Sequence, residues 1–135
     1  MARCAEIVRE LISQWNHHDA RQAASLLAED VYYWDVTQEV PFSKRSEVQE
    51  FFQMFFNAFP NLSFEIISIF ESGEQVACEW RMRGTQEKEL PGINAIGKSI
   101  DLAGVSICTV KGNKVSRQVD YWDGGTMSKQ LGLAG

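Results

Sequence analysis

A change of hydrophobic period near Pro60 separates two parts of the chain with different secondary structure. Before Pro60, apolar residues recur every three or four positions, which is the spacing of helices with one buried face. After it, apolar and polar residues alternate, which predicts strands at about 62–71, 75–86, 99–110 and 114–123. Helices that precede a run of antiparallel strands pack onto one face of their sheet. The sequence therefore predicts an α+β fold with three N-terminal helices on a strongly curved, mostly antiparallel sheet.

The part before Pro60 carries start and stop signals for individual elements. Apolar residues up to Trp15 form one helical stripe, and Asp19 and Ser46 are residue types that cap helix N-termini. Phe59 precedes a proline, where helices tend to end. We expect helices over about 3–16, 20–28 and 46–59 and a short strand over 31–36.

Gly-containing turns separate the expected strands. Ser72–Glu74 and Lys111–Asn113 are short enough for hairpins, whereas Glu87–Lys98 is a longer loop that could cover the mouth of a pocket. No repeat or linker interrupts the 135 residues, and 44% of them are hydrophobic, which supplies one sizeable core. We expect a single domain over residues 1–135, shaped as a cone with its pocket between helices and sheet.

Charge and composition argue against several kinds of partner. The net charge is −5 and the Lys and Arg residues are scattered, so nucleic acid is not expected as a partner. No run of about 18 apolar residues predicts a membrane span, and the first residues lack a secretory signal pattern. We expect a cytoplasmic protein that does not bind membranes.

The three cysteines do not have the spacing of a metal site or of a disulfide framework. Cys78 and Cys108 fall in strand patterns and are expected to pack, reduced, in the core. A catalytic thiol would need a histidine nearby in the fold, which the sequence does not exclude. His17 and His18 have no spaced partner that suggests a metal site, and no cofactor is expected.

The strongest candidate for chemistry is Asp123, which lies beside aromatic residues near the end of the last strand. Along an extended strand Asp123 shares its parity with Val119 and Tyr121, which places it on the apolar side, whereas Asp120 would face outward. Apolar surroundings favour the neutral form of a carboxyl group and let it act as an acid near neutral pH. The alternative is that Asp123 caps a final short helix or ends the strand.

Two further residues are weaker candidates for catalysis. Asp35 ends the expected first strand and could be a second carboxylate of the pocket, although such residues also form turns. His17 could overhang the pocket as an acid or base, although the helix dipole alone favours a histidine at a helix end.

The aromatic excess of the sequence suggests a cavity for a flat hydrophobic ligand, although any one of these residues could simply be core. The expected pocket residues are Trp15, Trp34, Phe51, Phe55, Trp80, Met82 and Tyr121. On the opposite sheet face we expect an exposed surface that suits a homodimer contact or solvent alike. Its expected members are Glu79, Arg81, Arg83, Gln118 and Trp122.

The order of elements resembles that of the nuclear transport factor 2-like superfamily over nearly the whole chain. The resemblance is carried by Trp15-Asn16 and Asp19 at the end of the first helix and by Ala28-Glu29-Asp30-Val31 before the first strand. It implies a cone-shaped fold with three helices on a curved sheet.

The C-terminal part is similar to that of SnoaL-like polyketide cyclases. The matching residues are Asp123 with the following Gln130-Leu131-Gly132, and Arg83-Gly84-Thr85 in a middle strand. The resemblance implies a cofactor-free intramolecular aldol cyclisation of a hydrophobic, carbonyl-bearing substrate, with Asp123 as acid and base. Asp35 or a water would then take the proton of the carbon acid.

Other branches of the superfamily provide alternatives. The segment that ends in Asp35 resembles the one carrying the general base of ketosteroid isomerases, but their oxyanion-stabilising tyrosine and aspartate match Leu11 and Ser106 here. Missing oxyanion donors argue against that reaction. An epoxide hydrolase would need an arginine in the cavity, and Arg81 and Arg83 are expected to face outward. A non-catalytic binding or dimeric interaction domain stays open, because the fold hosts both.

Overall fold

A computed structural model describes residues 3–90 and 94–133 of the protein. The elements run in the order that the sequence predicts, with an additional short helix after the last strand. They are α1 (Cys4–Asn16), α2 (Ala20–Ser25), β1 (Leu27–Asp35), α3 (Arg45–Ala58), β2 (Ser63–Ser72), β3 (Gln75–Thr85), β4 (Ser99–Lys111), β5 (Lys114–Trp122) and α4 (Gly124–Gln130).

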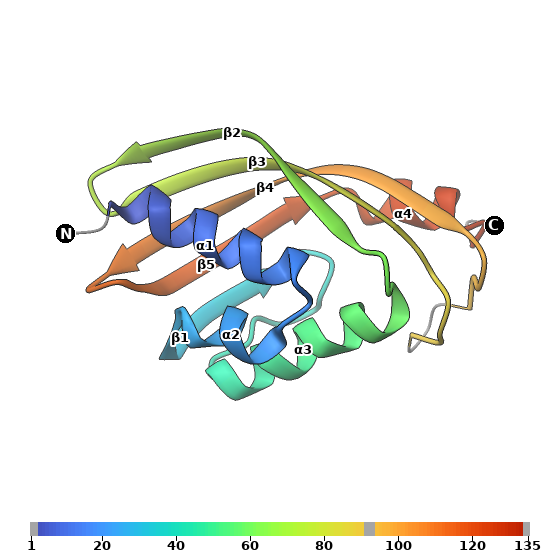
Figure 1. Cartoon of the computed structure of the whole chain (residues 1–135), viewed down its shortest axis with the longest axis horizontal. Helices are drawn as coiled ribbons and strands as arrows, with labels where there is room; N and C mark the ends of the chain where they lie inside the picture. Colours follow the sequence, from blue (N-terminus) through green and yellow to red (C-terminus); the bar gives the residue numbers. More distant parts are fainter. Residues whose placement is uncertain (1–2, 91–93, 134–135) are drawn as a thin grey trace.

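The five strands form one curved sheet in the order β1-β5-β4-β3-β2. All neighbours are antiparallel except β1 and β5, which pair in parallel. Helices α1, α2 and α3 lie together on the concave side of this sheet, and α4 lies at the far end of β5 (Figure 1). The α+β prediction, with three N-terminal helices on a mostly antiparallel curved sheet, is confirmed.

A local signal explains where α2 begins, whereas α3 begins without one. The Asp19 carboxylate accepts a hydrogen bond from the Gln22 backbone N–H at 2.9 Å and caps α2, as expected. The third helix instead begins at Arg45, with Lys44 as its N-cap residue and no side-chain cap, so the prediction for Ser46 is wrong. Helix α2 also ends earlier than predicted, because Leu27 starts β1 as a register partner of Val115.

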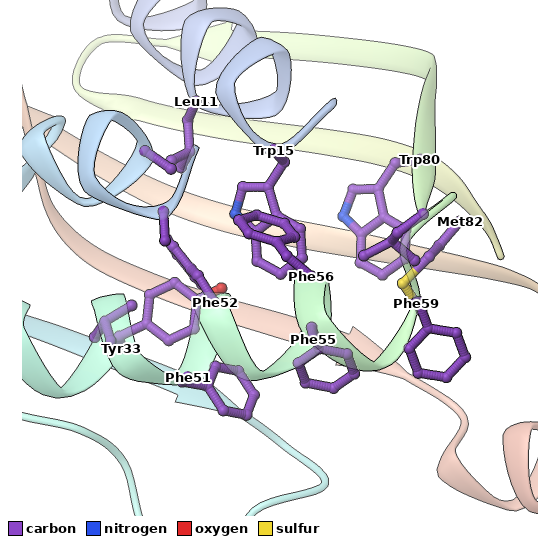
Figure 2. Close-up of a cluster of buried hydrophobic side chains, with 14 of the residues drawn as sticks. Leu11, Trp15, Tyr33, Phe51, Phe52, Phe55, Phe56, Phe59, Trp80 and Met82 are labelled. Atoms are coloured by element: carbon purple, nitrogen blue, oxygen red, sulfur yellow. The ribbon is translucent and has the colours of Figure 1, made fainter. Parts of the chain in front are cut away.

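Aromatic residues of α3 dominate the core between the helices and the sheet. Phe52 and Phe56 pack edge-on against the indole of Trp15, with ring centroids 4.6 and 4.9 Å away. Trp80 of β3 joins this cluster through Phe64 of β2. Figure 2 shows the rings of Trp15, Phe52, Phe56 and Trp80 gathered on the concave side of the sheet. This packing holds α1 and α3 over the middle of the sheet, and it is the frame of the cavity described below.

A β-bulge at Ser116 reverses the parity of β5. Thr109 is paired with Arg117, but the next residue of β4, Val110, is paired with Val115, so Ser116 is an extra residue in β5. A one-residue bulge changes which residues of a strand face the core. After the bulge, Gln118, Asp120 and Trp122 therefore face the concave side, and the predicted outward orientation of these three residues is wrong.

The convex face of the sheet consequently differs from the expected one. Glu79 and Arg83 are exposed there, as predicted, and Arg81 forms an ion pair with Asp101 at 2.6 Å. Gln118 and Trp122 are absent from this face, because both line the interior cavity. An apolar row instead crosses all five strands in register, formed by Phe70, Ala77, Ile107, Val119 and Trp34. We call these five residues the convex row.

Other sequence expectations concern the cysteines, the long loop and membrane helices. Cys78 and Cys108 are buried free thiols, and burial raises the pKa of Cys78 to about 11. The loop Glu87–Lys98 includes residues 91–93, which lie outside the described part of the chain, and Leu90 and Ala95 on either side are buried. Within residues 3–90 and 94–133, no helix is long and apolar enough to cross a membrane.

Candidate active site

A cavity of about 40 Å³ lies between the concave face of the sheet and helices α1 and α3. This is room for roughly three water-sized groups, so the head of a ligand fits without movement of the walls. The walls are mostly apolar, and five side chains with hydroxyl, carboxyl or amide groups stand together on β1, β4 and β5. The lining residues are Leu11, Ile12, Trp15, Tyr33, Asp35, Phe51, Phe55, Phe64, Trp80, Met82, Ser106, Gln118, Asp120 and Trp122.

Asp120 is the centre of a hydrogen-bond network in this cavity. Its Oδ2 accepts a hydrogen bond from the Tyr33 hydroxyl at 2.5 Å, and its Oδ1 accepts one from the Ser106 hydroxyl at 2.6 Å. Gln118 Nε2 also donates to Oδ1, at 2.8 Å. Trp80 Nε1 donates in turn to Ser106 Oγ at 2.9 Å, which orients that hydroxyl toward the carboxylate. Asp120 is 9% exposed.

Burial changes the acidity of the two central groups. Desolvation raises the pKa of Asp120 from 3.8 to about 6, against the opposing effect of the hydrogen bonds from Ser106, Tyr33 and Gln118. Desolvation and the adjacent Asp120 raise the pKa of Tyr33 well above its usual value, so its hydroxyl stays a proton donor. A carboxyl group with a pKa of about 6 exchanges protons readily near neutral pH.

Asp35 supplies a second carboxyl group to the cavity. It is 5% exposed, and its backbone is the register partner of Asp120 in the parallel β1–β5 pair. The indole N–H of Trp122 donates to Asp35 Oδ2 at 3.0 Å, and the Thr37 hydroxyl and backbone N–H donate to Oδ1. The sequence left two positions open for Asp35, the end of a strand before a turn or the wall of the pocket. In the structure Asp35 occupies both.

Asp123 is on the surface, and the prediction that it faces an apolar interior is wrong. It is the N-cap residue of α4, where its Oδ1 accepts from the Gly125 backbone N–H and its Oδ2 from the Thr126 hydroxyl. These hydrogen bonds, Thr126 first, lower the pKa of Asp123. The alternative interpretation, a cap of a final short helix, describes its position. A lowered pKa is the opposite of what a neutral acid needs.

Five of the seven expected pocket residues line the cavity: Trp15, Phe51, Phe55, Trp80 and Met82. Tyr121 does not, because after the bulge it faces the convex side, where it is 48% exposed. Trp34 also faces that side, and its Nε1 donates to the Gln38 carbonyl. Trp122, expected outside, takes a place in the cavity instead.

The histidines at the end of α1 lie away from the cavity lining. His17 is exposed and forms the C-cap of the helix. His18 is half-buried, with its Nε2 2.6 Å from the Leu62 carbonyl and its ring stacked on Phe56. Within the described residues, no group of three or more His, Cys, Asp or Glu side chains is arranged to hold a metal ion.

Sequence reasoning missed Asp120, Tyr33, Ser106 and Gln118 as members of one site. Gln118 and Asp120 alternate with the apolar Val119, which is a strand pattern, but the pattern does not say which side is inside. Tyr33 carries no signal beyond its alternation with Tyr32 and Trp34. The network becomes visible only when β1, β4 and β5 are placed in register.

Solved structures with the same fold come from several bacteria. IdmH, a candidate polyketide cyclase from Streptomyces antibioticus, is 21% identical with a TM-score of 0.83, covering 97% of this chain and 99% of that one. TsrD from Streptomyces laurentii is 15% identical with a TM-score of 0.85 and 99% coverage of both chains. A protein with a ketosteroid isomerase-like fold from Catenulispora acidiphila, in complex with trimethylamine, is 18% identical, with a TM-score of 0.82 and coverage of 96% and 94%. These similarities confirm the cone-shaped nuclear transport factor 2-like fold.

The sequence itself also matches a family. The sequence model of the SnoaL-like polyketide cyclases matches residues 5–131, which include every helix and strand except the first residue of α1. No protein of curated function matches the chain.

Proposed function

Because the chain belongs to the SnoaL-like polyketide cyclase family, we propose that it is a cofactor-independent enzyme for acid/base chemistry on a hydrophobic carbonyl compound. In this proposal Asp120, and not Asp123, is the acid, and Asp35 is the base. One observation carries it: a buried carboxyl group with a pKa of about 6 lies in an apolar cavity and is held by three hydrogen-bond donors.

The proposed reaction is an aldol-type ring closure or a related proton transfer. Asp35 takes a proton from the carbon next to one carbonyl, and the resulting enolate attacks a second carbonyl of the same substrate. Neutral Asp120 donates its proton to that second carbonyl oxygen as the carbon–carbon bond forms, which gives a hydroxyl group. Asp35 then holds the proton taken from the substrate carbon and Asp120 is ionised, so transfer of one proton from Asp35 to Asp120 restores the starting state.

The donors around Asp120 support a role in transferring a proton. Ser106, Tyr33 and Gln118 stabilise the carboxylate that remains after Asp120 has donated, so its charge does not form unaided in an apolar cavity. Desolvation works in the other direction and keeps the proton available before the reaction. Desolvation and the hydrogen bonds together leave the pKa of Asp120 at about 6, so its protonated and ionised forms are both accessible near neutral pH.

The proposal is tested with Asp120→Asn, which keeps the size of the side chain but cannot transfer the proton. The measurement is exchange of the α-protons of 2-tetralone in deuterium oxide, followed by proton NMR. This ketone has a single carbonyl, so in its enolisation Asp120 donates to the carbonyl oxygen while Asp35 takes the α-proton, and exchange depends on both transfers. We expect the wild-type protein to accelerate exchange and Asp120→Asn to lose about a hundredfold or more of that acceleration. Asp123→Asn is the matched control, because it changes a carboxyl group three residues away on the surface, and it should exchange like the wild type.

Two outcomes would contradict the proposal. Equal exchange by the wild type and Asp120→Asn would remove Asp120 from the chemistry. Tight binding of the ketone without accelerated exchange would favour the competing class, a non-catalytic domain that binds small hydrophobic molecules.

A ketosteroid isomerase-like reaction is a third candidate. Leu11 stands where those isomerases place a tyrosine, so Tyr33 of the cavity would have to supply the phenol hydroxyl instead.

A partner is proposed as well: a second copy of this chain on the convex face. The convex row supports this, because it crosses all five strands and begins at Phe70, which is 68% exposed, while Ala77, Ile107 and Trp34 are partly exposed and Val119 is buried. The test is the molar mass in solution by light scattering. We expect a dimer for the wild type and for Ser46→Glu on the helical side, and a monomer for Ile107→Glu in the middle of the row. A monomeric wild type would contradict it.

A further inference from the structure

Gln118 carries a buried hydrogen-bond acceptor that no group of the described chain satisfies. The side chain lines the cavity and is 4% exposed, and its Oε1 has no hydrogen-bond donor among the described residues. Buried polar atoms of proteins are nearly always paired, because an unpaired one has lost its hydration without replacement. An unpaired oxygen in the wall of a cavity therefore points to the occupant of that cavity.

The orientation of the Gln118 amide follows from its neighbour. Nε2 lies 2.8 Å from Asp120 Oδ1, and only the amide nitrogen can donate to a carboxylate. A rotation that exchanged the two amide atoms would bring Oε1 against Oδ1, two acceptors in contact. Hence Oε1 is the free end of this side chain.

Neighbouring donors are already engaged. The Tyr33 and Ser106 hydroxyls both donate to Asp120. The Trp80 indole N–H donates to Ser106, and the Trp122 indole N–H donates to Asp35. Turning any of these toward Gln118 would break a hydrogen bond within this network. The donor for Oε1 has to come from a molecule in the cavity.

We propose that Gln118 is a specificity residue whose Oε1 accepts a hydrogen bond from a hydroxyl or N–H group of the substrate, so that the substrate carries such a donor near its reacting carbonyl. The inference rests on the proposed function for the carbonyl. Gln118 Nε2 lies 2.8 Å from Asp120 Oδ1, so the other amide atom, Oε1, lies within about 5 Å of that carboxylate oxygen. The donor and the carbonyl are therefore about the width of one ring apart.

A pair of small ketones tests this requirement. Acetophenone carries the carbonyl alone, and 3-hydroxyacetophenone adds a hydroxyl across the ring that is too far from the carbonyl to bond to it internally. We expect the wild-type protein to bind the hydroxyl compound roughly fivefold more tightly or better, measured by titration calorimetry.

Two variants assign the preference to one atom. Gln118→Met keeps the length of the side chain and removes both amide atoms, whereas Ser106→Ala removes another donor to Asp120 Oδ1 and leaves the Gln118 acceptor in place. Loss of the Asp120 contact affects both ketones alike, because both carry the same carbonyl. We therefore expect the hydroxyl preference to disappear in Gln118→Met and to persist in Ser106→Ala.

Equal affinity of the wild type for the two ketones would overturn the inference, as would a preference that survives in Gln118→Met. The result separates from the test of the proposed function, because it measures affinity and no proton transfer. A hydroxyl preference that depends on Gln118, in a protein without accelerated exchange, would uphold the specificity residue and contradict the enzyme.

Discussion

Asp35 and Asp120 are register partners in the parallel pair of β1 and β5, and both carboxyl groups face one apolar cavity. The proximity of Asp35 adds to the desolvation that raises the pKa of Asp120. Their hydrogen-bond donors differ. Asp35 accepts from the Thr37 hydroxyl in the turn and from the Trp122 indole. Asp120 accepts from two hydroxyl groups and from the side-chain amide of Gln118. Two carboxyl groups in unlike surroundings are suited to separate acid and base roles.

The burial of Asp120 predicts how stability depends on pH. Its pKa is raised from 3.8 to about 6 in the folded state, so the folded protein holds this proton more tightly than the unfolded chain. The resulting stabilisation is complete below pH 3.8 and is lost as the pH rises through about 6, and it amounts to about 3 kcal/mol. Asp120→Asn does not titrate, so its unfolding free energy relative to wild type should rise by about that amount between pH 4 and pH 7.

Urea denaturation of both proteins across this pH range measures the difference directly. Other titrating groups, such as the exposed Asp101 beside Arg81, are common to both proteins and largely cancel. A difference that stays constant with pH would show that Asp120 has an ordinary pKa in the folded protein.

The donors to Asp120 predict the pH dependence of turnover. If the neutral form of Asp120 is the acid, the rate should fall as the pH rises through about 6. Ser106 and Tyr33 stabilise the charged form, so Ser106→Ala and Tyr33→Phe should each raise that apparent pKa, with the larger shift in Ser106→Ala. Rate profiles of 2-tetralone exchange for the three proteins measure this. A shift to lower pH in either variant would reverse the assigned role of the hydroxyl.

Gly104 should not tolerate a side chain. A Cβ atom there would lie 2.3 Å from the six-membered ring of Trp80, whose indole is bonded to Ser106 and packed on Phe64. Gly104→Ala therefore has to displace the indole, which we expect to cost about 1–3 kcal/mol of unfolding free energy. Urea denaturation measures it, with Ala103→Ser on the exposed side of the same strand as the control. Wild-type stability in Gly104→Ala would show that Trp80 moves freely.

Asp123 should affect stability and leave the chemistry unchanged. Asp123→Ala removes the acceptors for the Gly125 backbone N–H and the Thr126 hydroxyl at the start of α4. We expect a lower melting temperature and faster amide exchange in α4, because the helix loses its cap. The rate of 2-tetralone exchange should equal that of the wild type. A large loss of rate in a folded variant would return Asp123 to the list of catalytic groups.

The periodic parts of the sequence predicted the fold well, for a physical reason. The alternation in β3 and β4 is unbroken, so inward residues such as Trp80 and Met82 were placed correctly from the pattern alone. Helices α1 and α3 each bury one continuous stripe, which a period of 3.6 reveals. The exception is α2, where Leu27 fits a helical stripe and a buried strand equally well, and pairing with Val115 decides for the strand.

The candidate site could be predicted only in part, because its membership depends on one irregularity of β5. Before the bulge Val115 faces the core, and counting by twos from it puts Val119 and Tyr121 inside and Asp120 outside. The extra residue Ser116 reverses that count. The local sequence does not indicate the bulge. Ser116 does not have the positive φ that would favour a glycine, and its hydroxyl donates to the Thr109 carbonyl only once β4 and β5 are paired.

Because of the bulge at Ser116, a single inserted residue decides which side chains of β5 line the cavity. Strand β5 carries two interleaved sets of side chains, a polar one with Gln118 and Asp120 and an apolar one with Val119 and Tyr121. Deleting a single residue at the bulge would exchange the two sets while most backbone hydrogen bonds could still form. A lineage with this scaffold thus has a short route, by insertion or deletion, between a cavity that carries an acid and a cavity lined only for packing.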